Sequence, residues 1–126
     1  MYQSTKLIGN LGKDPDARYT PSGQLVVSFP MATSHSYKKD EEWHTETTWW
    51  KITVWGQRGE ACQNRLQKGS RVFVEGRITV DKETHNPRVF QLKDGTWASS
   101  LELTANTVIF LDKKQKDDSD EDQNPF

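Results

Sequence analysis

The chain has 126 residues, of which 33 % are hydrophobic and 28 % are charged, and its net charge is −1. This length predicts one domain, with or without a tail. The single Cys62 excludes an internal disulfide, and because there is no long apolar run, we expect a cytosolic protein with neither a secretion signal nor a membrane span.

The first part of the chain predicts extended structure interrupted by turns. The expected elements are a strand at 3–9, a turn at 9–12, an extended piece near 17–19, a strand at 25–34 and a charged loop at 38–46. In the second of these strands, every other residue from Leu25 to Met31 is apolar, so one face of the strand is expected in a core.

Residues 49–55 read Trp-Trp-Lys-Ile-Thr-Val-Trp and predict a strand with two different faces. The presumed inner face carries Trp50, Ile52 and Val54, and the other carries Trp49, Lys51, Thr53 and Trp55. Flat aromatic rings beside a cation suit unstacked bases and the phosphates between them. The alternative, in which both faces are buried and the indoles only pack, remains open at this point.

The second half of the chain predicts one helix and two more strands. The expected elements are a helix at 58–68, a strand at 71–80, a long hairpin excursion at 82–97, and a last strand whose Leu101, Leu103, Ala105, Ile109 and Leu111 complete the core. Gly76 lies within the strand at 71–80, where a small barrel bends sharply. Five strands with a short helix between the third and the fourth predict an all-β fold, the OB-fold barrel, with an extended hairpin between the fourth and fifth strands.

The charges divide the chain into a body and a tail. Residues 1–111 hold 14 Lys and Arg against 12 Asp and Glu, whereas residues 112–126 hold three Lys against six acids. The tail has no apolar side chain before its last two residues, so we expect it to be disordered. Its acidic residues can steer it toward a basic surface and Phe126 can anchor it, which predicts a protein-binding tip formed by Asp120, Glu121, Asp122, Pro125 and Phe126.

Several segments resemble the bacterial-type single-stranded DNA-binding protein family. They are LIGNLG at 7–12, DP at 14–15, RYTPSG at 18–23, WWKITVWG at 49–56, KGS at 68–70, VEGR at 74–77, LELTA at 101–105, and the acidic end that closes on Pro125 and Phe126. Each segment is weak alone, but together they follow the family's order over nearly the whole body.

The resemblance implies a homotetramer that binds single-stranded DNA with little sequence preference and recruits replication, recombination and repair proteins through its tip. It places Trp49, Trp55 and Tyr37 at base-stacking positions and Lys51 at a basic position beside them. Two departures stand out. The family often has an aromatic residue near 82–84, where this chain has Lys-Glu-Thr, so that Phe90 or Trp97 could stack instead; and Trp50 replaces a usual His near the subunit contacts.

Further candidates for DNA contact come from the residues themselves. Phe73 shares a strand face with Arg71 and Arg77, which suits either DNA or a subunit contact. The predicted DNA-binding set is Tyr37, Trp49, Lys51, Trp55, Phe73, Arg77, Lys82 and Arg88. For Trp43, which lies among acidic residues, a stacking role and simple packing against its own hairpin stay equally open.

Other functions find less support in the sequence. The three His residues lie far apart with no Cys or His at ligand spacing, so neither a metal site nor a cofactor is expected. No nucleophile signature or phosphate-binding glycine loop is present, which argues against an enzyme. The alternatives are an OB-fold protein-interaction subunit of a replication-restart complex and RNA binding of the cold-shock type. In all of these readings the protein is cytoplasmic, and DNA binding would place it at the nucleoid.

Overall fold

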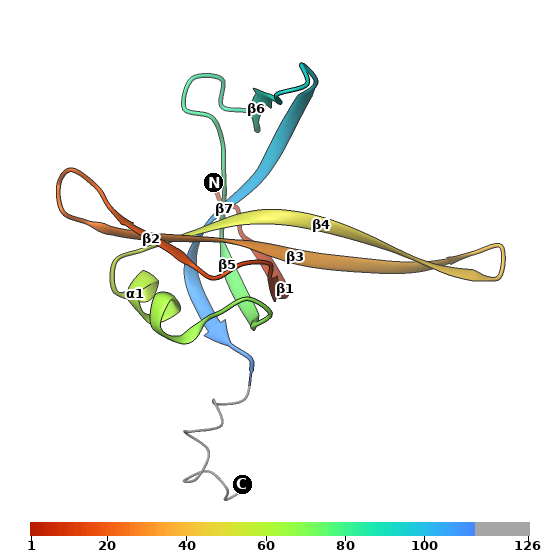
Figure 1. The fold of residues 1–126 in the computed structure, drawn as a ribbon, viewed down its shortest axis with the longest axis horizontal. Helices are drawn as coiled ribbons and strands as arrows, with labels where there is room; N and C mark the ends of the chain where they lie inside the picture. The colour runs from red at the N-terminus through yellow and green to blue at the C-terminus, as the bar shows by residue number, and fades with distance from the viewer. Residues whose placement is uncertain (113–126) are drawn as a thin grey trace, which may run out of the picture.

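A computed structural model describes residues 1–112, which form seven strands and one helix (Figure 1). The elements are β1 (Thr5–Leu11), β2 (Asp16–Tyr19), β3 (Leu25–Lys39), β4 (Glu42–Trp55), α1 (Gly56–Arg65), β5 (Arg71–Thr79), β6 (Arg88–Gln91) and β7 (Trp97–Phe110). Of the predicted tail at 112–126, only Asp112 is described, and its side chain accepts a hydrogen bond from the backbone N–H of Arg71 at 2.8 Å; the predicted tip lies outside the described residues.

Five of these strands close into a barrel. The hydrogen-bonded order runs β1-β5-β7-β4-β3, and β1 also pairs with β3, which completes the ring. All these pairs are antiparallel except β4 with β7, which are parallel. Strand β2 extends the sheet beside β3, and β6 pairs only with the start of β7. With α1 between the third and fourth barrel strands, this is the predicted OB-fold.

The barrel core follows the predicted alternation along β3, β4 and β5. Its fully buried side chains include Val27, Phe29 and Met31 from β3 and Ile52 and Val54 from β4. Gly76 lies where the register between β5 and β7 shifts, and a Cβ on it would lie 2.0 Å from the carbonyl oxygen of Thr104. Only glycine therefore permits this close approach of the two strands.

The helix is shorter and earlier than predicted. It begins at Gly56 and ends at Arg65, whereas the sequence predicted 58–68. The reason is Leu66, whose extended backbone turns its side chain into the core while its N–H donates to the carbonyl of Cys62 at 2.9 Å. Burial of that side chain outweighs the three further helical residues that the sequence predicted. Gly69, at a φ of 91°, lies in the following turn instead of capping the helix.

The prediction that Leu101, Ile109 and Leu111 complete the core is wrong. All three side chains are exposed, and Val108 and Phe110 pack against the core instead. Glu75 of β5 pairs with Thr107 but Gly76 pairs with Ala105, so β7 contains one extra residue at this point. A bulge of this kind exchanges the inward and outward faces of the residues that follow it, which accounts for Ile109 and Leu111. Leu101 precedes the bulge and has the same parity as the buried Leu103, but it pairs with the half-buried Trp50 and lines the groove described below.

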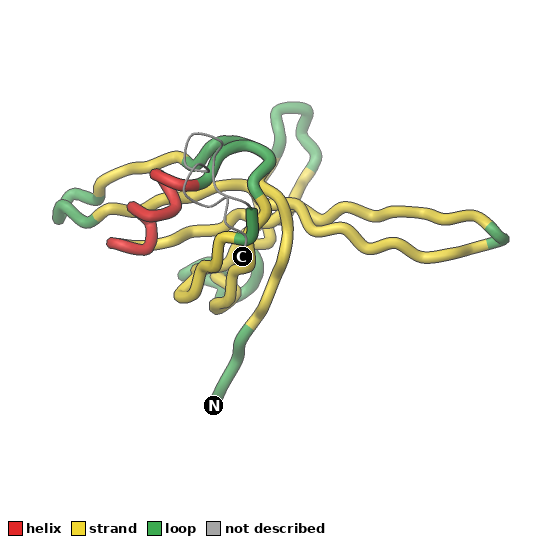
Figure 2. Tube along the Cα trace, turned by 90° about the horizontal axis from the view of Figure 1, so that it is seen from below, coloured by secondary structure: helices red, strands yellow, loops and turns green. Residues whose placement is uncertain are grey.

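The predicted loop at 38–46 is also wrong, because β3 and β4 continue through it. Their pairing is unbroken from Val26 with Trp55 to Lys39 with Glu42. A two-residue turn at Asp40 and Glu41 joins the strands, with φ values of 53° and 67°, as in hairpin turns that match the strand twist. The result is a long two-stranded arm that projects from the barrel (Figures 1 and 2).

The excursion predicted at 82–97 is present as a hairpin of β6 and β7 that stands above the barrel (Figure 1). The turn that leads into it is organised by Asp81. One of its carboxylate oxygens accepts hydrogen bonds from the backbone N–H groups of Glu83 and Thr84, at 2.8 and 3.1 Å. These two bonds lower the pKa of Asp81, so the turn is held by an ionised side chain at neutral pH.

Candidate nucleic-acid interface

The outer face of β4 carries two exposed indoles. Trp49 is 55 % exposed and Trp55 is 41 % exposed, whereas the intervening Ile52 and Val54 are fully buried. The open-face interpretation of the Trp-rich strand is therefore confirmed. At a rise of about 3.3 Å per residue, the two indoles lie about 20 Å apart along the strand, with the exposed Lys51 between them.

Part of the surface between the two indoles consists of small hydroxyl side chains. Cross-strand pairing aligns Ser28, Thr53 and Thr104 in one row, and Arg77 ends that row on β5. The Thr104 hydroxyl lies 2.7 Å from the hydroxyl of Thr79. Because none of these hydroxyl side chains is bulky, a flat ring can approach the strand beside the indoles while the hydroxyls remain able to donate hydrogen bonds.

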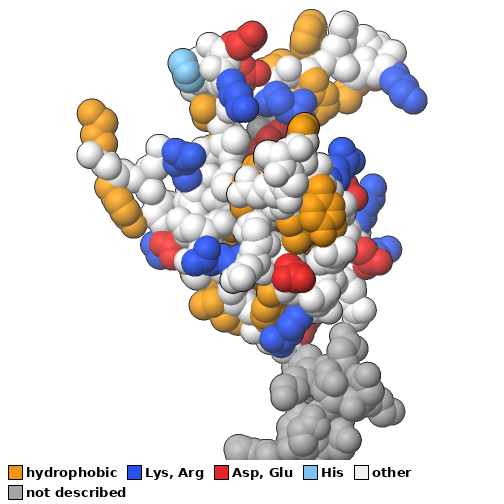
Figure 3. All heavy atoms as spheres, turned by 90° about the vertical axis from the view of Figure 1, so that its left-hand side faces the viewer, with side chains coloured by type: hydrophobic (Ala, Val, Ile, Leu, Met, Phe, Trp, Pro, Cys, Tyr) orange, Lys and Arg blue, Asp and Glu red, His pale blue; other side chains and the backbone are white. Residues whose placement is uncertain are grey.

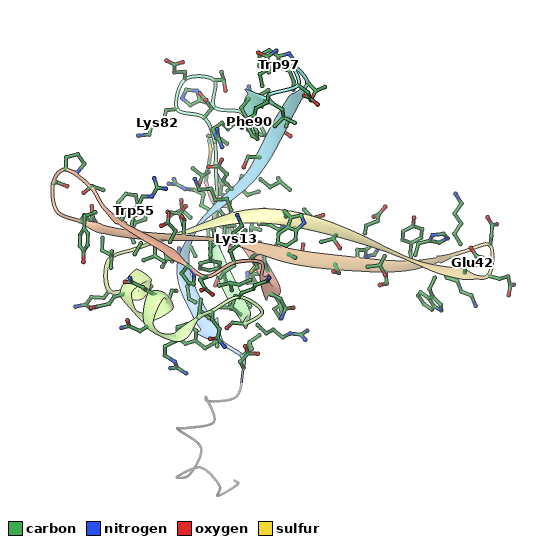
Figure 4. All side chains as sticks on the ribbon, in the orientation of Figure 1. Lys13, Glu42, Trp55, Lys82, Phe90 and Trp97 are labelled. Carbon is green, nitrogen blue, oxygen red and sulfur yellow. The ribbon has the colours of Figure 1, made fainter. Side chains whose placement is uncertain are left out.

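A groove of about 460 Å³ runs from the Trp49 side of β4 to the β6–β7 hairpin. It is lined by Lys13, Asp14, Asp16, Ser28, Phe29, Pro30, Trp49, Trp50, Lys51, Phe90, Ser99, Ser100 and Leu101. Phe90 thus shares the groove with Trp49 and Lys51, although it comes from a separate element; Figure 4 shows it on the hairpin above the barrel. The sequence left Phe90 and Trp97 as alternatives, and only Phe90 lines this groove.

Arg88 links the hairpin to the barrel. Its guanidinium carbon lies 4.8 Å from the centre of the Phe90 ring, and its Nε donates to Glu102 at 2.9 Å. Burial raises the pKa of Glu102, but hydrogen bonds from Arg88 and Ser100 and the charges of Arg88 and Lys51 outweigh it, so the net pKa lies below its usual value. Glu102 is therefore ionised at neutral pH and holds Arg88 against the aromatic ring.

The position of the Trp49 ring is set by Gly12. A Cβ built on Gly12 would lie 2.5 Å from Cζ3 and 2.8 Å from Cη2 of Trp49. The indole therefore rests directly against backbone that has no side chain, which gives an otherwise exposed ring one fixed support. The sequence motif contained this glycine, but its contact with Trp49 could not be read from the strand pattern.

The structure groups some of the predicted residues and separates others. Trp49, Lys51, Trp55, Arg77 and Arg88 come together around the outer face of β4, β5 and the hairpin. Lys and Arg side chains gather in the upper part of Figure 3, where the hairpin meets the barrel. Lys82 is exposed on the turn beside the hairpin, outside the lining of the groove (Figure 4).

Tyr37 lies on the other face of the arm. Its partner in the ladder is His44, and strand alternation places both on the face that carries Met31 and Trp50 nearer the barrel. The Tyr37 ring is stacked between His35 and His44, with centroids 6.1 and 5.4 Å away. A base that stacks on Tyr37 must therefore approach the ribbon from the side opposite Trp49.

Phe73 belongs to a third surface. It pairs with Ile8 of β1 and with Ile109 of β7, which gives a row of three apolar side chains across the outside of the barrel. Ile8 is 52 % exposed and Ile109 is 50 % exposed. Of the two roles left open for Phe73, this setting favours the subunit contact, because a row of three apolar side chains, two of them half exposed, would be removed from water against another copy of the chain.

Trp50 is half-buried and Cys62 is fully buried, so both contribute to packing. The half-buried Trp50 donates its Nε1 hydrogen to the hydroxyl of Thr33 at 3.2 Å. Burial raises the pKa of the Cys62 thiol to about 11, so it is protonated at neutral pH.

Within residues 1–112 there is no group of three or more acidic, His or Cys side chains placed to hold a metal ion. Over the same residues, no helix has the length and apolar character needed to cross a bilayer.

Fold and surface together define a class: an OB-fold barrel whose outer face combines exposed aromatic rings with cations, as in proteins that bind single-stranded nucleic acid. Residues 2–111 match the single-strand binding protein family, and the chain belongs to it. This membership supports the prediction of a binding protein instead of an enzyme.

Known relatives agree with this placement. Single-stranded DNA-binding proteins of Xanthomonas campestris pv. campestris and Neisseria meningitidis serogroup A are each 36 % identical, over 107 and 106 residues that cover 83 % of the chain. The chain spans only 58 % and 57 % of their lengths.

Solved structures show the same architecture. The Plasmodium falciparum SSB in complex with ssDNA superposes with a TM-score of 0.68 at 26 % identity, covering 89 % of this chain and 96 % of that one. A small single-stranded DNA-binding protein from Streptomyces coelicolor gives a TM-score of 0.69 at 21 % identity, covering 86 % and 93 %, and supports the fold alone.

Proposed function

We propose that this protein binds single-stranded DNA by stacking bases on Trp49 and Trp55 while Lys51, Arg77 and Arg88 neutralise phosphates. The observation that carries the proposal is the pair of exposed indoles, 55 % and 41 % accessible, on the outer face of one barrel strand with a cation between them. Each stacked base contributes about 1–3 kcal/mol. Family membership supports the same ligand.

The recognition is expected to tolerate any sequence. Every base has a flat π-face, so indole stacking does not depend on base identity. The surface between the indoles carries the hydroxyls of Ser28, Thr53 and Thr104. These hydroxyls can rotate, so they can form hydrogen bonds with different bases or phosphates. Such binding suits the covering and protection of exposed single strands during replication, recombination and repair, in the cytoplasm at the nucleoid.

The test is tryptophan fluorescence with poly(dT), together with Trp49→Ala and Trp55→Ala. Stacking should quench the parent strongly, and each substitution should weaken binding by about 1–3 kcal/mol while the fold is retained. Affinity should fall with salt at a log–log slope of about −0.7 for each phosphate neutralised. A barrel that docks protein would show little quenching, and stronger quenching by poly(U) would favour RNA.

We further propose that the protein is a homotetramer, as its family resemblance implies. The apolar row of Ile8, Phe73 and Ile109 supports association of copies, since a monomer would leave it in water. Light scattering should give four times the monomer mass. Phe73→Asp should lower that mass, whereas Thr47→Asp, on the arm, should leave it unchanged.

The acidic tip, Asp120, Glu121, Asp122, Pro125 and Phe126, is proposed to bind partner proteins of replication, recombination and repair. The support is its composition: carboxylates for steering and a terminal aromatic residue for anchoring. Deletion of these residues should abolish pull-down of such partners and leave DNA binding equal or slightly tighter. Equal recovery of partners by the truncated chain would refute the assignment.

A further inference from the structure

A third tryptophan lies on the same ribbon face as Trp49 and Trp55. Trp43 precedes Trp49 by six residues, and Trp49 precedes Trp55 by six, so all three side chains share one face of β4. No break in the β3–β4 register interrupts this alternation. Trp43 is 71 % exposed, more than either of the other two. Its place in the arm is next to Glu42, which Figure 4 labels at the far end.

Strand pairing separates the charges of the arm by face. Glu42 pairs with Lys39 and Glu46 pairs with His35, so both carboxylates belong to the face that carries Tyr37. Trp43 instead pairs with Lys38. Of the four acidic neighbours that argue against a DNA contact in the sequence, Glu42 and Glu46 therefore lie on the opposite side of the ribbon, and Asp40 and Glu41 form the turn at its end.

The surface between Trp43 and Trp49 consists of hydroxyl side chains. The residues on this face are Ser34 and Ser36 from β3 and Thr45 and Thr47 from β4. Ser36 and Thr45 hydroxyls lie 3.1 Å apart. On the barrel, Ser28 and Thr53 likewise lie between Trp49 and Trp55, together with Pro30 and Lys51.

We propose that the outer face of the arm is a further subsite for single-stranded DNA, in which a base stacks on Trp43 and Lys38 neutralises the adjacent phosphate. The hydroxyls between Trp43 and Trp49 donate hydrogen bonds to the strand that passes over them. The inference rests on the proposed function, because it lengthens the path that begins at Trp55 and Trp49. The ligand is the same strand, continued about 20 Å beyond the barrel.

The position of the subsite makes its contribution depend on the length of the DNA. An oligothymidylate just long enough to saturate the barrel groove, as found by titrating the parent, does not reach Trp43. A longer one does. Trp43→Ala should therefore raise the Kd of the long oligonucleotide by about 5- to 150-fold and change that of the short one less than about twofold. Trp43→Phe, which keeps a ring, should recover part of the loss.

Two controls accompany this measurement on the full chain. Trp97→Ala removes the same side chain at a similar exposure of 66 %, from a position that does not line the groove, and should leave both Kd values nearly unchanged. Trp49→Ala should weaken both oligonucleotides. Lys38→Gln should reduce the magnitude of the slope of log affinity against log salt concentration by about 0.7, for the long oligonucleotide only.

Three results would overturn the subsite: an unchanged Kd of Trp43→Ala for the long oligonucleotide, an equal loss for short and long, or an equal loss in Trp97→Ala. Failure of the proposed function looks different. In that case Trp49→Ala and Trp55→Ala would leave binding of the short oligonucleotide intact, whatever the arm does.

Discussion

The contact between Gly12 and Trp49 predicts a substitution that weakens binding without weakening the fold. In Gly12→Ala the new Cβ would lie 2.5 Å from Cζ3 of Trp49, whereas ordinary contact begins near 3.4 Å, so the ring must move by about 0.9 Å. The ring is 55 % exposed and can swing toward solvent. Gly12 has no positive φ, so alanine fits its backbone and should stabilise the fold by up to about 1 kcal/mol through the unfolded state.

The same shift removes the indole from its support, so binding of single-stranded DNA should weaken by up to the value of one stacked base, about 1–3 kcal/mol. The assay is a thermodynamic cycle of Gly12→Ala, Trp49→Ala and the double variant, with Kd from fluorescence anisotropy and stability from urea unfolding. If the glycine acts through the ring, its effect on Kd disappears in the Trp49→Ala background. Equal losses in both backgrounds, or unfolding of Gly12→Ala at lower urea, would refute this reasoning.

Three further outcomes are expected. Gly76→Ala should destabilise the fold by about 1–3 kcal/mol in urea unfolding, because its Cβ would meet the Thr104 carbonyl oxygen at 2.0 Å and backbone cannot swing aside; an unchanged midpoint would contradict the bulge geometry. Cys62, with a pKa of about 11, should have about one thiolate in a thousand at pH 8, so iodoacetamide should label it slowly until urea exposes it. Lys51→Gln should flatten the salt dependence of binding by about 0.7, and an unchanged slope would exclude a phosphate contact.

The strand faces that could be predicted are those where alternation is uninterrupted. Along β4 the apolar Ile52 and Val54 alternate with Trp49 and Trp55, so a single parity argument identifies both the core and the exposed face. The five-strand order followed from turn residues and from the one helical segment. Resemblance and parity agreed on Trp49, Lys51 and Trp55 because both depend on the same residues.

The wrong or undecided predictions concern features that the alternation of apolar and polar residues does not indicate. The extra residue near Asn106 exchanges the faces of β7, and the sequence there, Ala-Asn-Thr-Val, contains neither Gly nor Pro to mark it. The arm was predicted as a loop because its residues are charged, yet the backbones of its two strands pair without a break as far as Lys39 and Glu42. Phe90 was left undecided, although Arg88 and Phe90 lie two apart in one strand, the same spacing of a cation and an aromatic residue as in Trp49 and Lys51.

The parallel pairing of β4 with β7 determines when the barrel can close during synthesis. Ile52 has Leu103 as its neighbour, so the ring stays open until the ribosome has released residues from the far side of the β6–β7 hairpin. The β3–β4 arm, by contrast, needs only a two-residue turn, so its strands can pair as soon as they leave the ribosome. In a nascent chain, the β3–β4 arm with its tryptophans should therefore form well before the barrel closes around its core.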